Sequence, residues 1–235
     1  MPSEGGGSYA ETIAYPASAT RRVAGGCARD SACAGRRHPG RRGTEFGLRE
    51  PQSRVGSGGH GRPRRSRSRT PGAFVDRKLL RGFAPFGIQA VGSRIFVTFA
   101  KQDAKGEDDV HGPGLGFVDA FDRNGKLLAR VARRGELNAP WGIARAPRTF
   151  GRFGGDLLIG NFGDGRINAF RQRPGGTFAP AGELRTAAGR RLVIDGLWAL
   201  QFGHGTANNG PANTLFFTAG PDDEAHGLFG TITAG

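Results

Sequence analysis

Short runs of apolar residues recur from about residue 84 onwards and predict β-strands. The most regular runs are five residues long, at 95–99, 157–161 and 215–219. Such runs, bounded by Gly, Pro and polar residues, are typical of strands that are buried on both faces. Each of them follows a run that contains an aromatic residue, and a third apolar run comes after it. The pattern therefore predicts an all-β fold built from many short strands.

The runs are organised in an internal repeat. Phe86, Trp141 and Trp198 stand near the start of successive copies, 55 and 57 residues apart. A repeat of this length with several short strands is a signature of β-propeller blades. We therefore predict a partial β-propeller of about three four-stranded blades. Their approximate boundaries are 84–133, 139–186 and 195–235.

The hairpins and the end of the third copy lead to two further predictions. Asn124–Gly125, between the runs 117–121 and 126–131, predicts a type I′ turn, in which both central residues have positive φ. The third copy has no fourth strand, and three blades cannot close a ring that normally needs four to eight. We therefore expect the C-terminal half of a larger propeller. Its last blade would take the missing strand from an N-terminal segment absent here, and further N-terminal blades would close the ring.

The first 72 residues differ in composition from the rest. They hold 14 Arg, no Lys and five acids, a net charge of +9, while the other 163 residues carry +5. Sixteen of the 17 Phe and both Trp lie after residue 72, so a packed core is confined to residues 73–235. An Arg- and Gly-rich stretch without apolar periodicity cannot offset the entropy of ordering. This composition predicts a disordered N-terminal tail.

Two interpretations of this tail stay open. As a functional arm it would bind nucleic-acid phosphates weakly and without sequence preference, because no aromatic residues are interleaved for base stacking. The alternative, which we favour, is that residues 1–72 are an out-of-frame translation of GC-rich DNA. Cys27 and Cys33 match no zinc or disulfide spacing. In the first interpretation, the functional arm, the arginines that would contact phosphates are Arg62, Arg64, Arg65, Arg67 and Arg69.

Candidate binding residues are expected where the topology brings loops together. In an up-and-down blade, the loop from the second to the third strand emerges on the same face as the connection to the next blade. Carboxylate and amide oxygens there suit Ca²⁺, which takes six to eight oxygen ligands. The candidate Ca²⁺ ligands are Asp103, Asp108, Asp109, Asn161, Asp164, Asp222 and Asp223. Further candidates for ligand binding are His111, Asp195, Glu224 and His226.

Turn formation can also account for these polar residues. Asp, Asn and Gly are the residues that tight turns require, and turn chemistry alone is sufficient for Gly163, Asp164 and Gly165. A catalytic interpretation would use His111 or His226 as a general base beside a bound metal. The sequence contains no nucleophile elbow, phosphate loop or metal-ligating His pair that would support it.

The aromatic residues near the start of each copy have two interpretations as well. Phe86, Trp141 and Trp198 would suit a rim that stacks against sugar rings. Large aromatic side chains dominate the energetics of cores, and these three recur at the structural period. We therefore favour a role as core wedges between adjacent blades.

Several segments resemble a known protein family. They are GFAPFGIQAVGSRIFVTFAKQDAKGEDDVHGPGLGFVDAFDRNGKLL, LNAPWGIARAP, GDLLIGNFGDGRINAF, VIDGLWALQFG and NTLFFTAGPDDEAHGLFGTI. The likeness covers roughly residues 74–233. The family comprises uncharacterised bacterial proteins, mostly exported, some with PEP-CTERM sorting tails, whose propeller is related to NHL repeats. The resemblance implies a secreted or cell-surface location and a longer N-terminus with a signal peptide and further blades.

The chain itself shows no signal-peptide pattern and no run of 18 apolar residues, so the sequence predicts neither an export signal nor a membrane-spanning helix.

A fold alone does not indicate an activity. The favoured function is therefore a binding or interaction scaffold for an unknown ligand or protein, with Ca²⁺ as the cofactor considered. One alternative is a metal-dependent enzyme that resembles NHL-type propeller lyases or lactone hydrolases. The second alternative is non-specific nucleic-acid binding through the tail.

Overall fold

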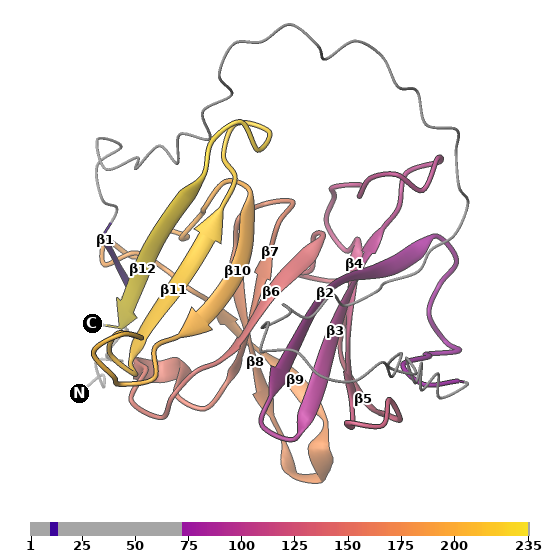
Figure 1. The fold of residues 1–235 in the computed structure, drawn as a ribbon, viewed down its shortest axis with the longest axis horizontal. Coiled ribbons are helices and arrows are strands. Elements are labelled where there is room, and N and C mark those ends of the chain that lie inside the picture. The colour runs from indigo at the N-terminus through magenta and orange to yellow at the C-terminus, as the bar shows by residue number, and fades with distance from the viewer. Residues whose placement is uncertain (1–9, 14–71, 235) are drawn as a thin grey trace, which may run out of the picture. The chain divides into compact units, whose positions relative to one another are not determined.

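The computed structural model describes residues 72–234 together with the backbone of residues 10–13. These residues form three antiparallel β-sheets of four strands each, which confirms the predicted all-β class and the three blades (Figure 1). In the described part, helical structure is confined to two short 3-10 turns, η2 (Gly151–Phe153) and η3 (Pro174–Gly176). No helix among the described residues has the length and hydropathy needed to span a membrane.

The strands follow one another in chain order within each sheet, apart from β1. The first sheet consists of β2 (Phe83–Val91), β3 (Arg94–Lys101), β4 (Gly116–Phe121) and β5 (Leu127–Arg133). The second consists of β6 (Pro140–Arg145), β7 (Leu157–Asn161), β8 (Ile167–Gln172) and β9 (Phe178–Glu183). The third consists of β10 (Leu197–Phe202), β11 (Thr214–Ala219), β12 (Leu228–Ala234) and β1 (Ala10–Ile13).

The fourth strand of the third sheet comes from the N-terminal part of this chain. β1 pairs antiparallel with β12, in a register that runs from Ala10 opposite Ala234 to Ile13 opposite Thr231. An N-terminal strand thus completes the last sheet, as expected, but it lies within this chain and inside the stretch expected to lack structure. The rest of that stretch up to residue 71, with the Arg62 to Arg69 cluster and both cysteines, lies outside the described residues.

The hydrophobic core lies between successive sheets. On β7, Leu157 and Ile159 pack with Phe96 and Val118 of the first sheet, whereas Leu158 packs with residues of the third sheet. Alternate residues of a strand point to opposite faces, so this central strand is covered on both sides. Every residue of β7 is buried, as the continuous apolar run predicts.

The Asn124–Gly125 hairpin forms, but its turn is not type I′. Gly125 has a φ of 81°, and Asn124 is not among the residues with positive φ. The Asp122 carboxylate instead accepts hydrogen bonds from the backbone amides of Asn124 (2.8 Å) and Lys126 (2.9 Å). Because the Asp122 side chain organises the turn, a single left-handed glycine is sufficient.

Candidate ligand-binding site

The loops 102–115, 162–166 and 220–227 join the second and third strands of the three sheets, and the first and last of them stand at the top of Figure 1. We call the side on which these loops emerge the loop face. Backbone hydrogen bonds tie the loops to the connections between sheets. Ala139 donates to Leu115 (3.1 Å), Ile194 to Gly165 (2.9 Å) and Gly220 to Gly196 (2.9 Å). The structure therefore places the loops beside the connections, as the blade topology predicts.

Two buried asparagines fix the path of the first two loops. The Asn138 Oδ1 accepts a hydrogen bond from the Gly112 amide at 2.6 Å. The Asn161 Nδ2 donates to the Glu136 carbonyl (2.8 Å) and to the Asp164 carboxylate (3.0 Å). Asn161 is fully buried, and its Nδ2 holds the loops in place. Its Oδ1 is buried without a hydrogen-bond partner among the described residues, so its role as a Ca²⁺ ligand stays a prediction.

Asp103 and Asp108 mainly stabilise their own loop. The Asp103 carboxylate accepts the Glu107 amide at 2.9 Å, and that hydrogen bond is the main reason why the pKa of Asp103 is lowered. The Asp108 carboxylate accepts the Asp109 amide at 2.9 Å. Turn chemistry therefore accounts for one carboxylate oxygen of each residue.

Asp109 and His111 form the most unusual polar pair of the loop face. The Asp109 Oδ2 lies 3.1 Å from the His111 Nε2 and forms no hydrogen bond with a described residue. The Asp109 side chain is 6% exposed, whereas that of His111 is 51% exposed. Burial raises the pKa of Asp109, the His111 ring opposes the rise, and the nearby Asp108 adds to it. A buried carboxylate thus stands behind an imidazole ring that faces solvent.

The His111 ring joins a group of aromatic side chains from two repeats. It packs edge-on against Phe162, with ring centroids 5.2 Å apart. Phe162 lies 6.1 Å from Phe86 and 6.2 Å from Trp141, and Phe86 and Trp141 are 4.6 Å apart. We call Phe86, His111, Trp141 and Phe162 the aromatic cluster. It combines rings from β2, β6 and the loops 102–115 and 162–166 in one place.

The position of these rings corrects the expectation that Phe86, Trp141 and Trp198 are core wedges. All three are partly exposed, and none belongs to the hydrophobic core clusters between the sheets. They lie on β2, β6 and β10, which are edge strands of their sheets in the described structure. Phe86 and Trp141 do bridge the first two sheets, but they do so at the surface.

The third loop carries the remaining predicted residues and a strained backbone. Asp222, Asp223 and Glu224 have φ values of 57°, 51° and 63°, the left-handed region that side-chain-bearing residues rarely occupy. The Glu224 Oε1 accepts the Trp198 Nε1 at 3.0 Å, and the Asp195 carboxylate accepts the Asp222 amide at 3.1 Å. A further contact links Asp222 to His226 at 3.7 Å, with both side chains exposed.

The predicted Ca²⁺ ligands come from three parts of the structure: the loop 102–115, the end of β7 with the loop 162–166, and the loop 220–227. Asp164 accepts from Asn161 and from the Arg166 amide (3.2 Å), and its other oxygen lies 3.8 Å from the Arg166 guanidinium. Among residues 72–234, no three His, Cys, Asp or Glu side chains come together in a group that could hold a metal ion.

Phe162 is the member of the aromatic cluster that sequence reasoning missed. It follows Asn161 directly and precedes the turn residues Gly163 and Asp164. A large apolar residue among turn residues was the available signal. Its backbone amide donates to the Ala139 carbonyl at 2.9 Å, which anchors the ring beside the start of β6.

Comparisons with known proteins give relatives without an assigned function. No protein-family model matches the chain. It is similar to uncharacterized protein R648 of Acanthamoeba polyphaga mimivirus, with 36% identity over 151 residues, which cover 64% of this chain and 36% of that protein. Uncharacterized protein L690 of the same virus is 34% identical over 151 residues, which cover 64% of this chain and 38% of that protein. The chain thus spans little more than a third of the length of these relatives.

A solved structure named as a "putative gluconolactonase" aligns with 64% of this chain and 58% of its own length, at 18% identity and a TM-score of 0.35. The fold assignment rests on the three sheets themselves. The relatives reported above are viral, so the expected membership of a bacterial exported family gains no support from them and stays a prediction.

Proposed function

We propose that this chain is a ligand-binding scaffold and that its loop face binds a carbohydrate on the aromatic cluster. The observation that supports the proposal most directly is that Phe86, Trp141 and Phe162 gather at the surface, partly exposed, and not in the core. A pyranose ring has an apolar face of C–H groups, which packs against aromatic rings. Aromatic side chains offer large, rigid contact areas for such packing.

Polar groups next to the rings suit the hydroxyl groups of a sugar. The exposed His111 ring borders Phe162, and its Nε2 faces the buried Asp109 carboxylate. A neutral imidazole offers one hydrogen-bond donor and one acceptor. Ligand sites commonly combine apolar walls with a few such polar groups.

Hydrogen bonds within the protein hold the residues of this site in place before a ligand binds. Asn138 fixes Gly112 next to His111, and Asn161 fixes the loop that follows Phe162. Interactions that order the binding surface before binding reduce the entropy lost when the ligand arrives. This supports a binding surface whose main elements are already in position.

Metal-dependent catalysis and nucleic-acid binding have no comparable observation in their favour. In the described part of the chain, the candidate metal ligands do not gather into a group of three or more. The arginines proposed to contact nucleic acid, Arg62 to Arg69, lie outside the described residues.

Calorimetric titration with cellopentaose, chitopentaose and maltopentaose, each with and without Ca²⁺, tests the proposal. We expect at least one of these sugars to bind the full chain, and Trp141→Ala to weaken that binding about tenfold, the effect of losing ~1.4 kcal/mol of ring contact. Phe229→Ala is the matched control, because Phe229 is 60% exposed but lies on β12, outside the aromatic cluster. Sugar binding that is equal in the Trp141→Ala and native proteins, or no binding of any sugar, would contradict the proposal.

A further inference from the structure

A pocket, separate from the loop face and called the second pocket below, lies on one face of the first sheet. This face is turned away from the second sheet. Its floor includes Phe117 and Leu127, which belong to a small apolar cluster separate from the core between the first two sheets. The volume is about 1090 Å³, enough for an organic ligand. This pocket shares no residue with the aromatic cluster, and neither the predicted site residues nor the proposed function involves it.

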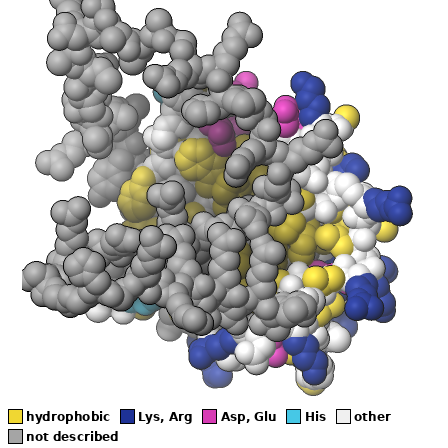
Figure 2. Space-filling view, turned by 45° about the vertical axis from the view of Figure 1, so that its right-hand side comes forward, with side chains coloured by type: hydrophobic (Ala, Val, Ile, Leu, Met, Phe, Trp, Pro, Cys, Tyr) yellow, Lys and Arg dark blue, Asp and Glu magenta, His cyan; other side chains and the backbone are white. Residues whose placement is uncertain are grey.

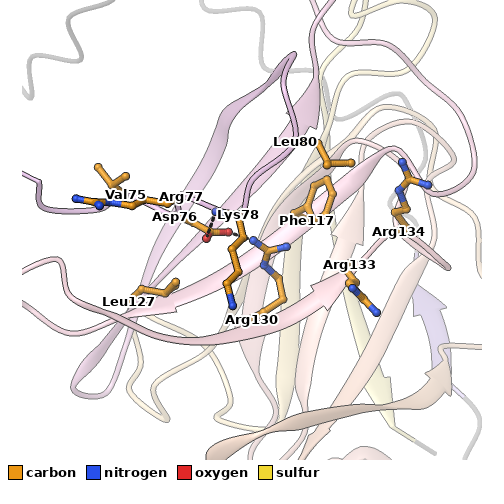
Figure 3. A pocket seen from close by; sticks show the side chains of 10 residues that line it. All are labelled: Val75, Asp76, Arg77, Lys78, Leu80, Phe117, Leu127, Arg130, Arg133 and Arg134. Carbon is orange, nitrogen blue, oxygen red and sulfur yellow. Dashed lines mark hydrogen bonds and ion pairs between the residues drawn. The ribbon is translucent and has the colours of Figure 1, made fainter.

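Five cationic side chains line the pocket: Arg77, Lys78, Arg130, Arg133 and Arg134 (Figure 3). The carboxylates that reach this region are already engaged, because Asp76 and Asp119 both contact the Arg130 guanidinium. Figure 3 shows the Asp76 carboxylate between that guanidinium and the Lys78 backbone, whose amide donates to Asp76 at 2.8 Å.

The other four cations have no ion pair with a described residue. Burial lowers the pKa of Arg130, and the positive charge of Arg133 lowers it further. The second effect shows that Arg133 adds positive charge close to Arg130. An anion among these side chains would be stabilised.

Apolar side chains adjoin these cations and remain open to solvent. Val75 is 50% exposed and Leu80 is 45% exposed. Phe117 lies under the Arg130 guanidinium, 4.8 Å from its ring centroid, and Figure 3 shows Leu80 beside the same ring. Figure 2, in which the right-hand side of Figure 1 comes forward, shows hydrophobic side chains and, along its right-hand and lower edges, Lys and Arg side chains. A ligand that covers this surface must combine an apolar body with negative charge.

The lining of the pocket indicates the chemistry of its occupant. We propose that the pocket binds an amphipathic organic anion, a single-chain carboxylate whose alkyl chain covers Val75, Leu80 and Phe117. Its carboxylate lies on the side of the pocket that Arg133 and Arg134 line. Arginine suits this role because its guanidinium binds carboxylate in a bidentate manner.

Calorimetry with three probes separates the two parts of this recognition. Decanoate, below its micelle concentration, has both the chain and the charge. Decyltrimethylammonium has the chain with the opposite charge, and acetate has the charge without the chain. We expect decanoate to bind the full chain at least about tenfold more tightly than either of the others, and its affinity to fall as salt rises. Equal binding of decanoate and decyltrimethylammonium, or of decanoate and acetate, would overturn the proposal.

Variants locate the binding. The double variant Arg133→Gln and Arg134→Gln should weaken decanoate binding at least about tenfold. The same two positions changed to Lys should weaken it less, because Lys keeps the positive charge but cannot bind the carboxylate in a bidentate manner. The control is the pair Arg148→Gln and Arg190→Gln, two exposed arginines that do not line the pocket. Trp141→Ala should leave decanoate binding unchanged, so this test and that of carbohydrate binding fail independently. Decanoate affinity that is unaffected by the Arg133 and Arg134 changes to Gln, in protein of native circular dichroism, would refute the site.

Discussion

A β-carbon on Gly87 would lie 2.5 Å from the carbonyl oxygen of Trp141. The strands β2 and β6, which begin neighbouring sheets, therefore approach each other at a residue of β2 that has no side chain. The same relationship recurs one sheet later, since a β-carbon on Gly142 would lie 2.5 Å from the carbonyl oxygen of Trp198. The Gly87 amide also donates to the buried Thr98 Oγ1 at 2.7 Å. The glycine after each of the first two aromatic residues therefore sets how closely successive sheets pack.

Gly142→Ala should destabilise the protein by about 1–3 kcal/mol, because the added methyl group meets backbone atoms that cannot rotate away. Denaturant unfolding followed by circular dichroism measures the change. Gly227→Ala is the matched control, since a β-carbon there would have no neighbour within 4 Å and the φ of Gly227 is not positive. Equal stabilities of the two variants would show that the sheets do not pack through Gly142.

Asn138→Ala should loosen the loop 102–115. It removes the acceptor of the Gly112 amide and leaves a partly buried donor unpaired, which costs about 1–3 kcal/mol. The exposed Lys105 lies in that loop, so trypsin should cut after it faster in the variant. Asn213→Ala, at an exposed position outside the loop, should be cut after Lys105 at the native rate, and a native rate in Asn138→Ala would contradict the role of Asn138.

Asp109 should make folding stability depend on pH. Its pKa is raised in the folded protein, so the folded state binds the proton more tightly than the unfolded state does. The resulting stabilisation is fully present below the ordinary value of 3.8 and is lost as pH rises through the raised pKa.

Asp109→Asn cannot ionise and should therefore lose less stability than the native protein between roughly pH 4 and pH 7. The free energy of unfolding, measured by urea titration across this range, gives the comparison. Asp223→Asn, at an exposed position in another loop, should follow the native pH dependence. If the free energy of unfolding changed with pH by the same slope in Asp109→Asn and in the native protein, the proposed effect of burial on Asp109 would be contradicted.

The sequence predicted most of the fold because burial on two faces leaves a direct trace in it. Every residue of β4 and β7 is buried, and both strands coincide with mainly apolar runs, in which Asp119 and Asn161 are the polar residues. β1 left no such trace. Its sequence, Ala-Glu-Thr-Ile, is short and half polar, so only its pairing with β12 identifies it as a strand.

The loop face was predictable in outline, whereas its chemistry was not. Up-and-down topology fixes the side on which each loop emerges, but the path within a loop depends on single hydrogen bonds such as that from Gly112 to Asn138. The approach of His111 to Phe162 follows from that path. The Asp119 and Arg130 pair of the second pocket lies directly across β4 and β5, so strand register indicates it, while Asp76 joins the pair from outside the sheet.

Acrylamide quenching of Trp141 tests the central claim, that the aromatic cluster is an open binding surface, most directly. The chain has two tryptophans, so Trp198→Phe leaves Trp141 as the single reporter. We predict that acrylamide quenches Trp141 in the free protein and that the sugar which binds by calorimetry protects it. A Trp141 that resists quenching without sugar, as a core residue would, or that is quenched equally with and without bound sugar, would contradict the account.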